Sequence, residues 1–257
     1  MTRFPKGQMR LYRHCARLQA PSRVVRDAIV SEVPQMRDRV VMIPNPRPDS
    51  ISTTAASPRG RERRIIYVGR VHPEKGVHLL IEAFVRLSEA QREGWKLVII
   101  GPAATRFGGG GETYESELAR LAASAGDAIE FRGAIFDPAE LEREFRSATL
   151  FVYPSLAEQG ETFGLAPLEA MAQACPVLVS DLACFRDFIE EGRTGFIFDH
   201  RAAEPVVTLS TRLAALMADE LLREQVGAAG YQKAEEYSIH RVADQFLADF
   251  ETVNGES

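Results

Sequence analysis

Six short apolar segments recur along the chain and alternate with segments in which apolar residues have helical spacing. Each apolar segment is bounded by Gly, Pro or Asp, which is typical of strands covered on both faces of a sheet. The predicted strands are Arg64–Val68, Leu97–Ile100, Ile129–Arg132, Leu150–Tyr153, Val177–Val179 and Phe196–Phe198. The predicted helices between them are Gly76–Glu89, Tyr114–Ala125, Pro138–Arg146, Leu165–Ala174 and Leu182–Glu190. This alternation predicts an α/β fold with one doubly wound, Rossmann-like parallel sheet.

The segment before this alternating region has too few elements to close a core of its own. It contains a predicted basic helix (Gln8–Leu18), a turn (19–22), a second helix (Arg23–Val33) and a short strand (Val40–Ile43). We therefore expect it to be the remnant of a second domain. The predicted divisions are this remnant (1–46), a Pro/Ser/Thr/Arg-rich linker (47–63), the Rossmann-like domain (64–235) and a final helix (238–253).

An apolar stripe marks the final helix, which we expect to cross back towards the N-terminal side. The stripe consists of Ile239, Val242, Phe246, Phe250 and Val253. Little of the chain is available to cover it. We expect either an exposed apolar patch or packing against the helices predicted within residues 8–33.

Composition narrows the class of protein. Of the 257 residues 45% are hydrophobic and 26% charged, as in ordinary globular proteins, and the net charge of −5 argues against nucleic acid as a partner. The N-terminus is basic but has no apolar core typical of a secretory signal, and no apolar run is long enough for a transmembrane helix. Three cysteines (Cys15, Cys175 and Cys184) match no metal spacing, so we expect reduced thiols in a cytoplasmic protein and a packing role for Cys175.

Two cations follow the first strand of the alternating region. Arg70 comes directly after that strand, and Lys75 lies at the start of the next helix. Open parallel sheets bind ligands beyond the C-terminal ends of their strands, and two cations beside a helix N-terminus suit a diphosphate. The residues alone leave open the alternative of two solvated surface charges. His72, between them, is interpreted as a loop residue. The Gly-rich segment 106–111 is interpreted as a flexible surface loop rather than a phosphate-binding loop.

Two glutamates, Glu161 and Glu169, flank a predicted helix start further along the chain. Gly164 favours a loop before the helix, and Pro167 is tolerated in its first turn. Free backbone N–H groups at that start suit an anion, and a carboxylate suits sugar hydroxyls. Two alternatives remain: Glu169 is a helix-start residue favoured by the helix dipole, or the two carboxylates act as an acid/base pair as in glycoside hydrolysis. The nearby cations favour a phosphate leaving group over the acid/base pair. Glu158 lacks the spacing of Glu161 to the helix start.

Three segments, YVGRVHPEKG, ETFGLAPLEAMAQACPVLVSD and EEGRTGFIF, occur in this order. Together they resemble the C-terminal domain of the family-4 (group 1) retaining glycosyltransferases, which have the GT-B fold, and the resemblance covers about residues 60–200. SRVVRDAI and VVMIPNP resemble the last elements of that family's N-terminal domain. The resemblance implies that most of the N-terminal, acceptor-side domain is missing from this chain.

The resemblance also implies residue roles. As catalytic groups, Arg70 and Lys75 would bind the diphosphate of a nucleoside-diphosphate sugar and offset its charge as it leaves, while Glu161 would contact the hydroxyls of the sugar. Glu169 would hold the ribose. The remaining donor-binding positions that it implies are Gly69, the backbone amides of Phe163, Gly164 and Leu165 at the sugar or β-phosphate, and Ile135, after Gly133, at the base.

By resemblance, the expected function is transfer of a sugar to an acceptor with retention of anomeric configuration, within a larger or split enzyme. A non-catalytic nucleotide-sugar-binding or regulatory module is the alternative; an epimerase or phosphorylase is disfavoured by the form of the motifs. No cofactor is expected, and no DxD-type motif stands at a strand end, so metal independence is predicted. Expected partners are a nucleotide sugar, a chain supplying the missing domain and, through the acceptor, the inner face of the membrane. A role in polysaccharide biosynthesis is a family-level expectation.

Overall fold

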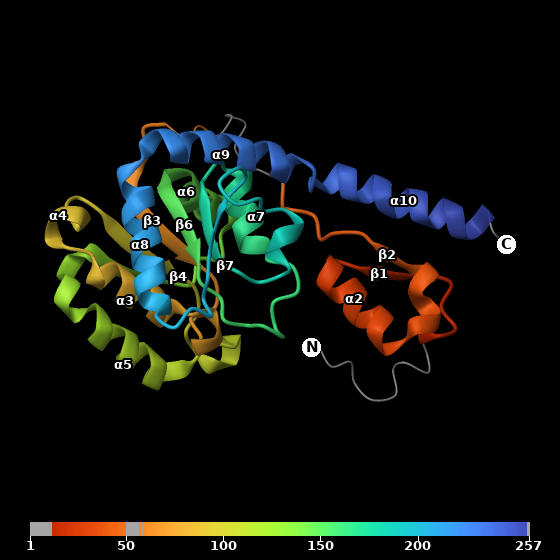
Figure 1. Ribbon diagram of the computed structural model, residues 1–257, viewed down its shortest axis with the longest axis horizontal. Helices are drawn as coiled ribbons and strands as arrows, with labels where there is room; N and C mark the ends of the chain where they lie inside the picture. Colours follow the sequence, from red (N-terminus) through yellow and green to blue (C-terminus); the bar gives the residue numbers. More distant parts are fainter. Residues whose placement is uncertain (1–11, 50–56, 58, 256–257) are drawn as a thin grey trace.

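The computed structural model describes residues 12–49, 57 and 59–255 (Figure 1). Six strands form one parallel sheet in the order β5-β4-β3-β6-β7-β8. Their bounds are β3 Glu62–Val68, β4 Lys96–Ile100, β5 Ile129–Gly133, β6 Ala148–Tyr153, β7 Val177–Ser180 and β8 Phe196–Phe198. All six predicted strands are therefore present, and the parallel doubly wound sheet is confirmed.

Helices enclose this sheet in two groups (Figure 1). One group packs α3 against α5 and α8, and the other packs α7 against α6 and α9. The bounds are α3 Val77–Arg86, α4 Glu89–Arg92, α5 Gly111–Ala122, α6 Pro138–Ser147, α7 Leu165–Ala172, α8 Pro205–Ala218, α9 Glu220–Glu235 and α10 Ile239–Gly255. Short 3₁₀ helices are η1 Pro34–Arg39, η2 Pro73–Lys75, η3 Thr105–Phe107, η4 Ala123–Ala128 and η5 Phe185–Asp187.

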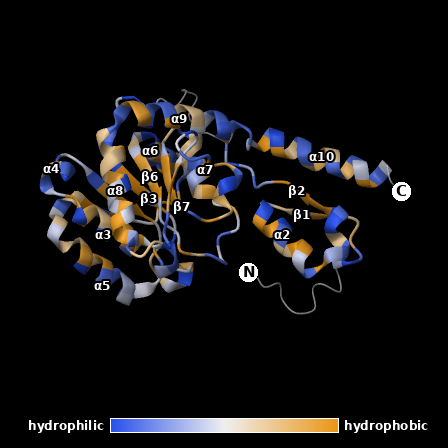
Figure 2. Ribbon diagram, viewed as in Figure 1, coloured by the Kyte–Doolittle hydropathy of each residue, from blue (hydrophilic) through white to orange (hydrophobic). Residues whose placement is uncertain are grey.

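The core runs through the middle of the sheet. Every residue of β6 and β7 is buried, and Figure 2 shows the apolar residues gathered in the strands. Strands that are covered on both faces cannot alternate polar and apolar residues without burying polar groups, which explains the continuous apolar runs. Among the helices within the described residues, none combines the length and hydrophobicity that a membrane crossing requires.

The strand order reverses direction between β3 and β6. The chain proceeds from β3 outwards to β5 and then returns to β6 on the other side of β3. The helices that follow these two central strands, α3 and α7, belong to different groups, and the loops that lead into them, residues 69–76 and 154–164, meet beyond the carboxyl ends of the strands. This switch point brings together the two loops that carry the predicted site residues.

One predicted helix is wrong. Over Leu182–Glu190 the structure has only the 3₁₀ turn η5, with i→i+3 hydrogen bonds such as Phe185 N to Leu182 O (3.1 Å). Phe185, Phe188 and Ile189 are all buried. Successive tight turns bury side chains at intervals of three or four residues, as a helix does, so the apolar spacing could not tell the two apart.

The N-terminal segment forms a small βαβ unit. Strands β1 (Leu18–Ala20) and β2 (Val40–Met42) pair in parallel, and α2 (Arg23–Glu32) connects them through η1. The second helix and the short strand are thus confirmed. The predicted helix over Gln8–Leu18 begins outside the described residues, and residues 13–17 are not helical. Residues 18–20 form a strand rather than a helix end and a turn, because they pair with a segment more than 20 positions away.

Helix α10 lies alongside this unit (Figure 1). Asp249 binds Arg17 Nε and Gln19 Nε2, each at 3.1 Å. Among its described residues Val242 is buried, whereas Leu247 is 59% and Phe250 53% exposed. Each alternative for the predicted stripe is therefore met in part: Val242 is buried and Phe246 and Val253 are half-buried, whereas Ile239 and Phe250 are exposed.

Candidate functional site

The loops after β3 and β6 contact each other through their backbones. Leu156 N donates a hydrogen bond to Glu74 O (2.7 Å). Gly76 has φ +66°, and a Cβ built on it would lie 2.1 Å from Pro154 O. Only glycine fits this position, since any other residue would be strained and would push the two loops apart.

A buried ion pair joins the two loops. Lys75 Nζ lies 2.8 Å from Glu161 Oε2, and the two side chains are only 7% and 12% exposed. Ser155 Oγ donates to the same carboxylate oxygen at 3.3 Å, and the Lys75 ammonium lies 5.8 Å from the centre of the Tyr153 ring. Burial, and then the Glu161 charge, raise the pKa of the Tyr153 hydroxyl far above its ordinary value. The sequence predicted both charged residues here but not their direct contact.

Arg70 lies directly after β3, and two contacts hold its guanidinium. Its Nη2 lies 2.6 Å from Glu74 Oε1, and its Nη1 donates to Gly108 O (2.8 Å). The Tyr67 hydroxyl donates to the Arg70 carbonyl at 2.7 Å, which anchors the backbone where β3 ends. Gly69, just before it, donates its N–H to Ile100 O of the neighbouring strand (3.0 Å). The guanidinium is thus oriented from both sides while remaining accessible.

The Gly-rich segment 106–111 packs against the loop after β3. Gly110 N donates to Val71 O (2.9 Å) and Gly111 N to Ala103 O (2.8 Å). These two hydrogen bonds fix the turn from which α5 begins. The interpretation as a flexible loop therefore misses its role, because its Gly108 carbonyl orients Arg70. Periodicity carries no signal for such backbone contacts. His72 is confirmed as a loop residue: its Nδ1 accepts from Glu74 N and caps η2.

Helix α7 begins with unpaired amides. Gly164 is its N-cap at φ +95°, and a Cβ there would lie 2.4 Å from the ring of the buried Phe185. Within the described part of the chain, the N–H groups of Phe163, Gly164 and Leu165 donate no hydrogen bond. The buried Phe163 side chain packs against an aromatic ring of Phe188 at 5.7 Å. Unpaired N–H groups at a helix start form a site for an anion.

Glu169 lies one turn further into α7, in different surroundings from Glu161. It is half-buried, lacks an ion-pair partner among the residues that the structure describes, and lines a small cavity of about 100 Å³ with Pro138 and Glu142. Burial raises the pKa of the Glu169 carboxyl. A buried carboxylate without a cation has its acceptor oxygens available for ligand hydroxyls.

The raised pKa of Glu169 predicts how stability depends on pH. Below the ordinary pKa of a glutamate both folded and unfolded states are protonated, and as pH rises the unfolded state releases its proton first. Glu169 therefore lowers the stability of the folded state progressively as pH rises through its folded-state pKa. We expect Glu169→Gln to raise the melting temperature at pH 8 and to change it little at pH 4.

Thermal unfolding from pH 4 to pH 8 measures this difference. Glu251→Gln, at an exposed position of α10, is the control and should show no comparable trend. If the melting temperature of Glu169→Gln, relative to that of the unchanged protein, fell as pH rises, the expected direction would be contradicted.

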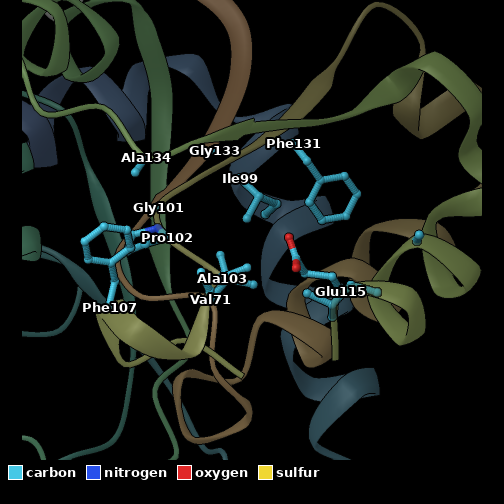
Figure 3. Close-up of a pocket in the computed structure, with 13 residues that line it drawn as sticks. Val71, Ile99, Gly101, Pro102, Ala103, Phe107, Glu115, Phe131, Gly133 and Ala134 are labelled. Carbon is cyan, nitrogen blue, oxygen red and sulfur yellow. The ribbon is translucent and has the colours of Figure 1, made fainter. Parts of the chain in front are cut away.

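A larger cavity of about 460 Å³ opens beside the ends of β4 and β5 (Figure 3). It is lined by Val71, Ile99, Gly101, Pro102, Ala103, Ala104, Phe107, Glu115, Leu118, Ala119, Phe131, Gly133 and Ala134. Figure 3 shows the Glu115 carboxylate directed into it. Ile135 follows the lining residues Gly133 and Ala134 and is half-buried against the core. Sequence reasoning missed Glu115 and Phe131, since neither stands in a motif.

Glu158 and Cys175, to which the sequence assigned no part in donor binding, take no part in the Lys75–Glu161 ion pair. Glu158 binds His200 Nε2 (2.8 Å) and Arg201 Nε (2.7 Å), and its hydrogen bond from Arg201 lowers the pKa of its carboxyl. The partner of Lys75 is Glu161, a contact that the sequence did not predict. Cys175 is fully buried, and burial raises the pKa of its thiol to about 11, which fits the predicted packing role.

The parallel sheet and its switch-point site define a Rossmann-like domain of the GT-B type. Among solved structures, Anabaena Alr3699/HepE in complex with UDP and glucose superposes with a TM-score of 0.77 at 17% identity, over 96% of this chain and 67% of that one. Sucrose-phosphate synthase from Thermosynechococcus elongatus does so with a TM-score of 0.78 at 19% identity, over 97% and 61%. At such low identities these matches establish the fold.

The model of the family described as "Glycosyl transferases group 1" matches residues 53–233, and the chain belongs to this family. It is 31% identical to a phosphatidyl-myo-inositol mannosyltransferase of Mycobacterium leprae over 74% of this chain and 47% of the relative. It is 30% identical to the lipopolysaccharide core biosynthesis mannosyltransferase LpsB of Rhizobium meliloti, over 72% and 50%. The chain thus spans about half the length of these relatives.

Proposed function

We propose that this chain forms the donor-binding half of a retaining glycosyltransferase of family 4. It takes a nucleoside-diphosphate sugar as donor and passes the sugar to an acceptor oxygen. The observation that carries the proposal is the buried Lys75–Glu161 ion pair, whose glutamate stands two residues before the three unpaired amides at the start of α7. A cation and anion-binding amides suit the diphosphate of such a donor, and a carboxylate suits the hydroxyls of its sugar.

Each group takes one part of the donor. Lys75 and Arg70 bind the diphosphate, and Glu161 accepts hydrogen bonds from the sugar. Glu169 binds the ribose hydroxyls, and its lack of a cation supports this role. The base lies against the backbone at Ile135. Gly69 allows the backbone to turn towards the phosphates.

In the reaction the bond between the anomeric carbon and the phosphate oxygen breaks, and the diphosphate leaves with the electron pair. The acceptor oxygen bonds to the same face of the anomeric carbon, and its proton passes to an oxygen of the departing diphosphate. Negative charge grows on the departing diphosphate, where Lys75, Arg70 and the α7 amides stabilise it without reorganising, which is how an enzyme favours a transition state over its substrate.

The other half of the cleft is not built by the described residues. The segment 12–43 is a single βαβ unit, and a second Rossmann-like domain needs on the order of 100–150 residues. We propose that this acceptor-side domain comes from a partner chain or from further sequence of the same protein. The names of the relatives favour an enzyme over a non-catalytic module. Independence of metals and cofactors, cytoplasmic location, contact with the inner membrane face and a role in polysaccharide biosynthesis stay predictions.

Calorimetric titration with UDP-, GDP- and ADP-sugars tests donor binding. We expect one base to be preferred, with a dissociation constant of about 1 µM to 1 mM, the usual range for enzyme substrates. Arg70→Ala should weaken binding about tenfold through loss of a charge-assisted hydrogen bond. Arg241→Ala, exposed on α10, is the matched control.

If the protein bound none of the three nucleotide sugars, the proposal would be contradicted. With the acceptor-side domain added, the anomeric configuration of the product, read by NMR, tests retention.

A further inference from the structure

The N-terminal βαβ unit contacts the donor loop through one buried hydroxyl. Ser22 is the N-cap of α2 and is fully buried. Its Oγ accepts a hydrogen bond from Val25 N at 3.3 Å and donates one to the carbonyl oxygen of Thr162 at 2.6 Å. The second bond joins residues 140 positions apart, and it ends in the loop between Glu161 and α7.

The Thr162 carbonyl belongs to the same peptide group as the Phe163 N–H. A trans peptide group is planar, so its C=O and N–H point in opposite directions. Holding the carbonyl towards Ser22 therefore directs the Phe163 N–H away from α2. A hydrogen bond to the carbonyl also polarises the peptide group and makes its N–H a better donor. This N–H is one of the three unpaired amides at the start of α7.

A second contact holds α2 in the same place. Arg23 N donates to Asp187 Oδ2 (2.9 Å), and Arg23 Nε lies 3.2 Å from Asp187 Oδ1. The Asp187 side chain is almost wholly buried, and the Tyr237 hydroxyl donates to its backbone carbonyl (3.1 Å). Asp187 ends the turn that carries Phe185, whose ring contacts Gly164. The start of α2 is thus hydrogen-bonded both to Thr162, just before α7, and to Asp187, at the end of η5.

We propose that Ser22 is a positioning residue for donor binding. Its hydroxyl, carried by the acceptor-side segment, sets the direction of the Phe163 N–H towards the β-phosphate of the donor. Docking of α2 onto the Rossmann-like domain is thereby coupled to affinity for the terminal part of the donor. This inference rests on the proposed function, because it assumes that these amides meet a nucleoside-diphosphate sugar.

Two substitutions of nearly equal size separate this role from helix capping. Ser22→Asn and Ser22→Asp both provide an oxygen that can accept from Val25 N, as good N-caps do. The asparagine amide can also donate to the Thr162 carbonyl, whereas an ionised aspartate cannot. Ser22→Ala removes both bonds without adding a charge.

Calorimetry with matched nucleoside di- and monophosphates measures the effect on the full chain. The pairs are UDP and UMP, GDP and GMP, and ADP and AMP; the pair that the unchanged protein binds is used. We expect Ser22→Asp and Ser22→Ala to bind the diphosphate about tenfold more weakly than Ser22→Asn, the loss of one hydrogen bond to a charged group. Monophosphate affinity should change less than about threefold, because a monophosphate has no β-phosphate for the Phe163 N–H to meet.

The outcomes separate this inference from the proposed function. Equal diphosphate affinities for Ser22→Asn, Ser22→Asp and Ser22→Ala would overturn the inference alone. An equal loss for mono- and diphosphates would assign Ser22 a merely structural role and would overturn it too. If the unchanged protein bound none of these nucleotides, the proposed function would fail first and the inference with it. Melting temperatures identify a variant that does not fold, in which case Ser22→Ala replaces Ser22→Asp in the comparison.

Discussion

Replacing Lys75 by methionine is expected to lower the affinity for the nucleoside-diphosphate sugar about 100-fold and the free energy of unfolding by about 3 kcal/mol. The first effect follows from loss of a charged hydrogen-bond donor at the diphosphate, together with its attraction for the phosphate charge. The second follows from the contact at 2.8 Å with Glu161, since removal of one partner leaves a buried charge without compensation.

A double substitution separates the two effects. In Lys75→Met/Glu161→Gln the remaining buried charge is neutralised, so most of the lost stability should return. Nucleotide-sugar affinity should stay low, because no cation is restored. Chemical unfolding measures the first quantity and calorimetry the second.

Two results would contradict this account of the ion pair. If the double variant bound the donor as well as the unchanged protein, Lys75 would not be a ligand of the diphosphate. If Lys75→Met unfolded at the same denaturant concentration as the unchanged protein, the pair would not be energetically coupled to the fold.

Gly76→Ala is expected to cost about 3 kcal/mol of unfolding free energy and to weaken donor binding at least about tenfold. The left-handed backbone accounts for about 1–2 kcal/mol, and overpacking for a further 1–3 kcal/mol. The new Cβ would lie 2.1 Å from Pro154 O, a backbone atom that can move only if the two loops separate. Separation would displace Lys75 from Glu161, which explains the expected loss of binding.

Gly192→Ala is the matched control for backbone strain. Gly192 has φ +71°, close to the +66° of Gly76, but a Cβ on it meets nothing within 4 Å. It should lose only the about 1–2 kcal/mol of left-handed strain and bind the donor normally. Equal losses at both positions would show that the contact with Pro154 carries no energy.

Much of the Rossmann-like domain could be predicted because its signals are local. All six strands and most helices followed from short apolar runs and helical spacing, as in β6, where every residue is buried. The segment 182–190 could not be assigned from spacing, because a chain of tight turns buries Phe185 and Phe188 much as a helix would. The strand Leu18–Ala20 was missed because it exists only through its pairing with Val40–Met42.

The sequence by itself determined which residues stand at the ends of the central strands, among them Arg70, Lys75 and Glu161, because strand ends and glycine turns are local properties of the chain. Only the tertiary structure decided that Lys75 and Glu161, 86 positions apart, form a buried pair, and that the Ser22 hydroxyl meets the Thr162 carbonyl across 140 positions. Such contacts depend on strand order and on the close approach of two backbones. Strand order and backbone approach cannot be recognised from sequence periodicity, since both depend on elements that are distant along the chain.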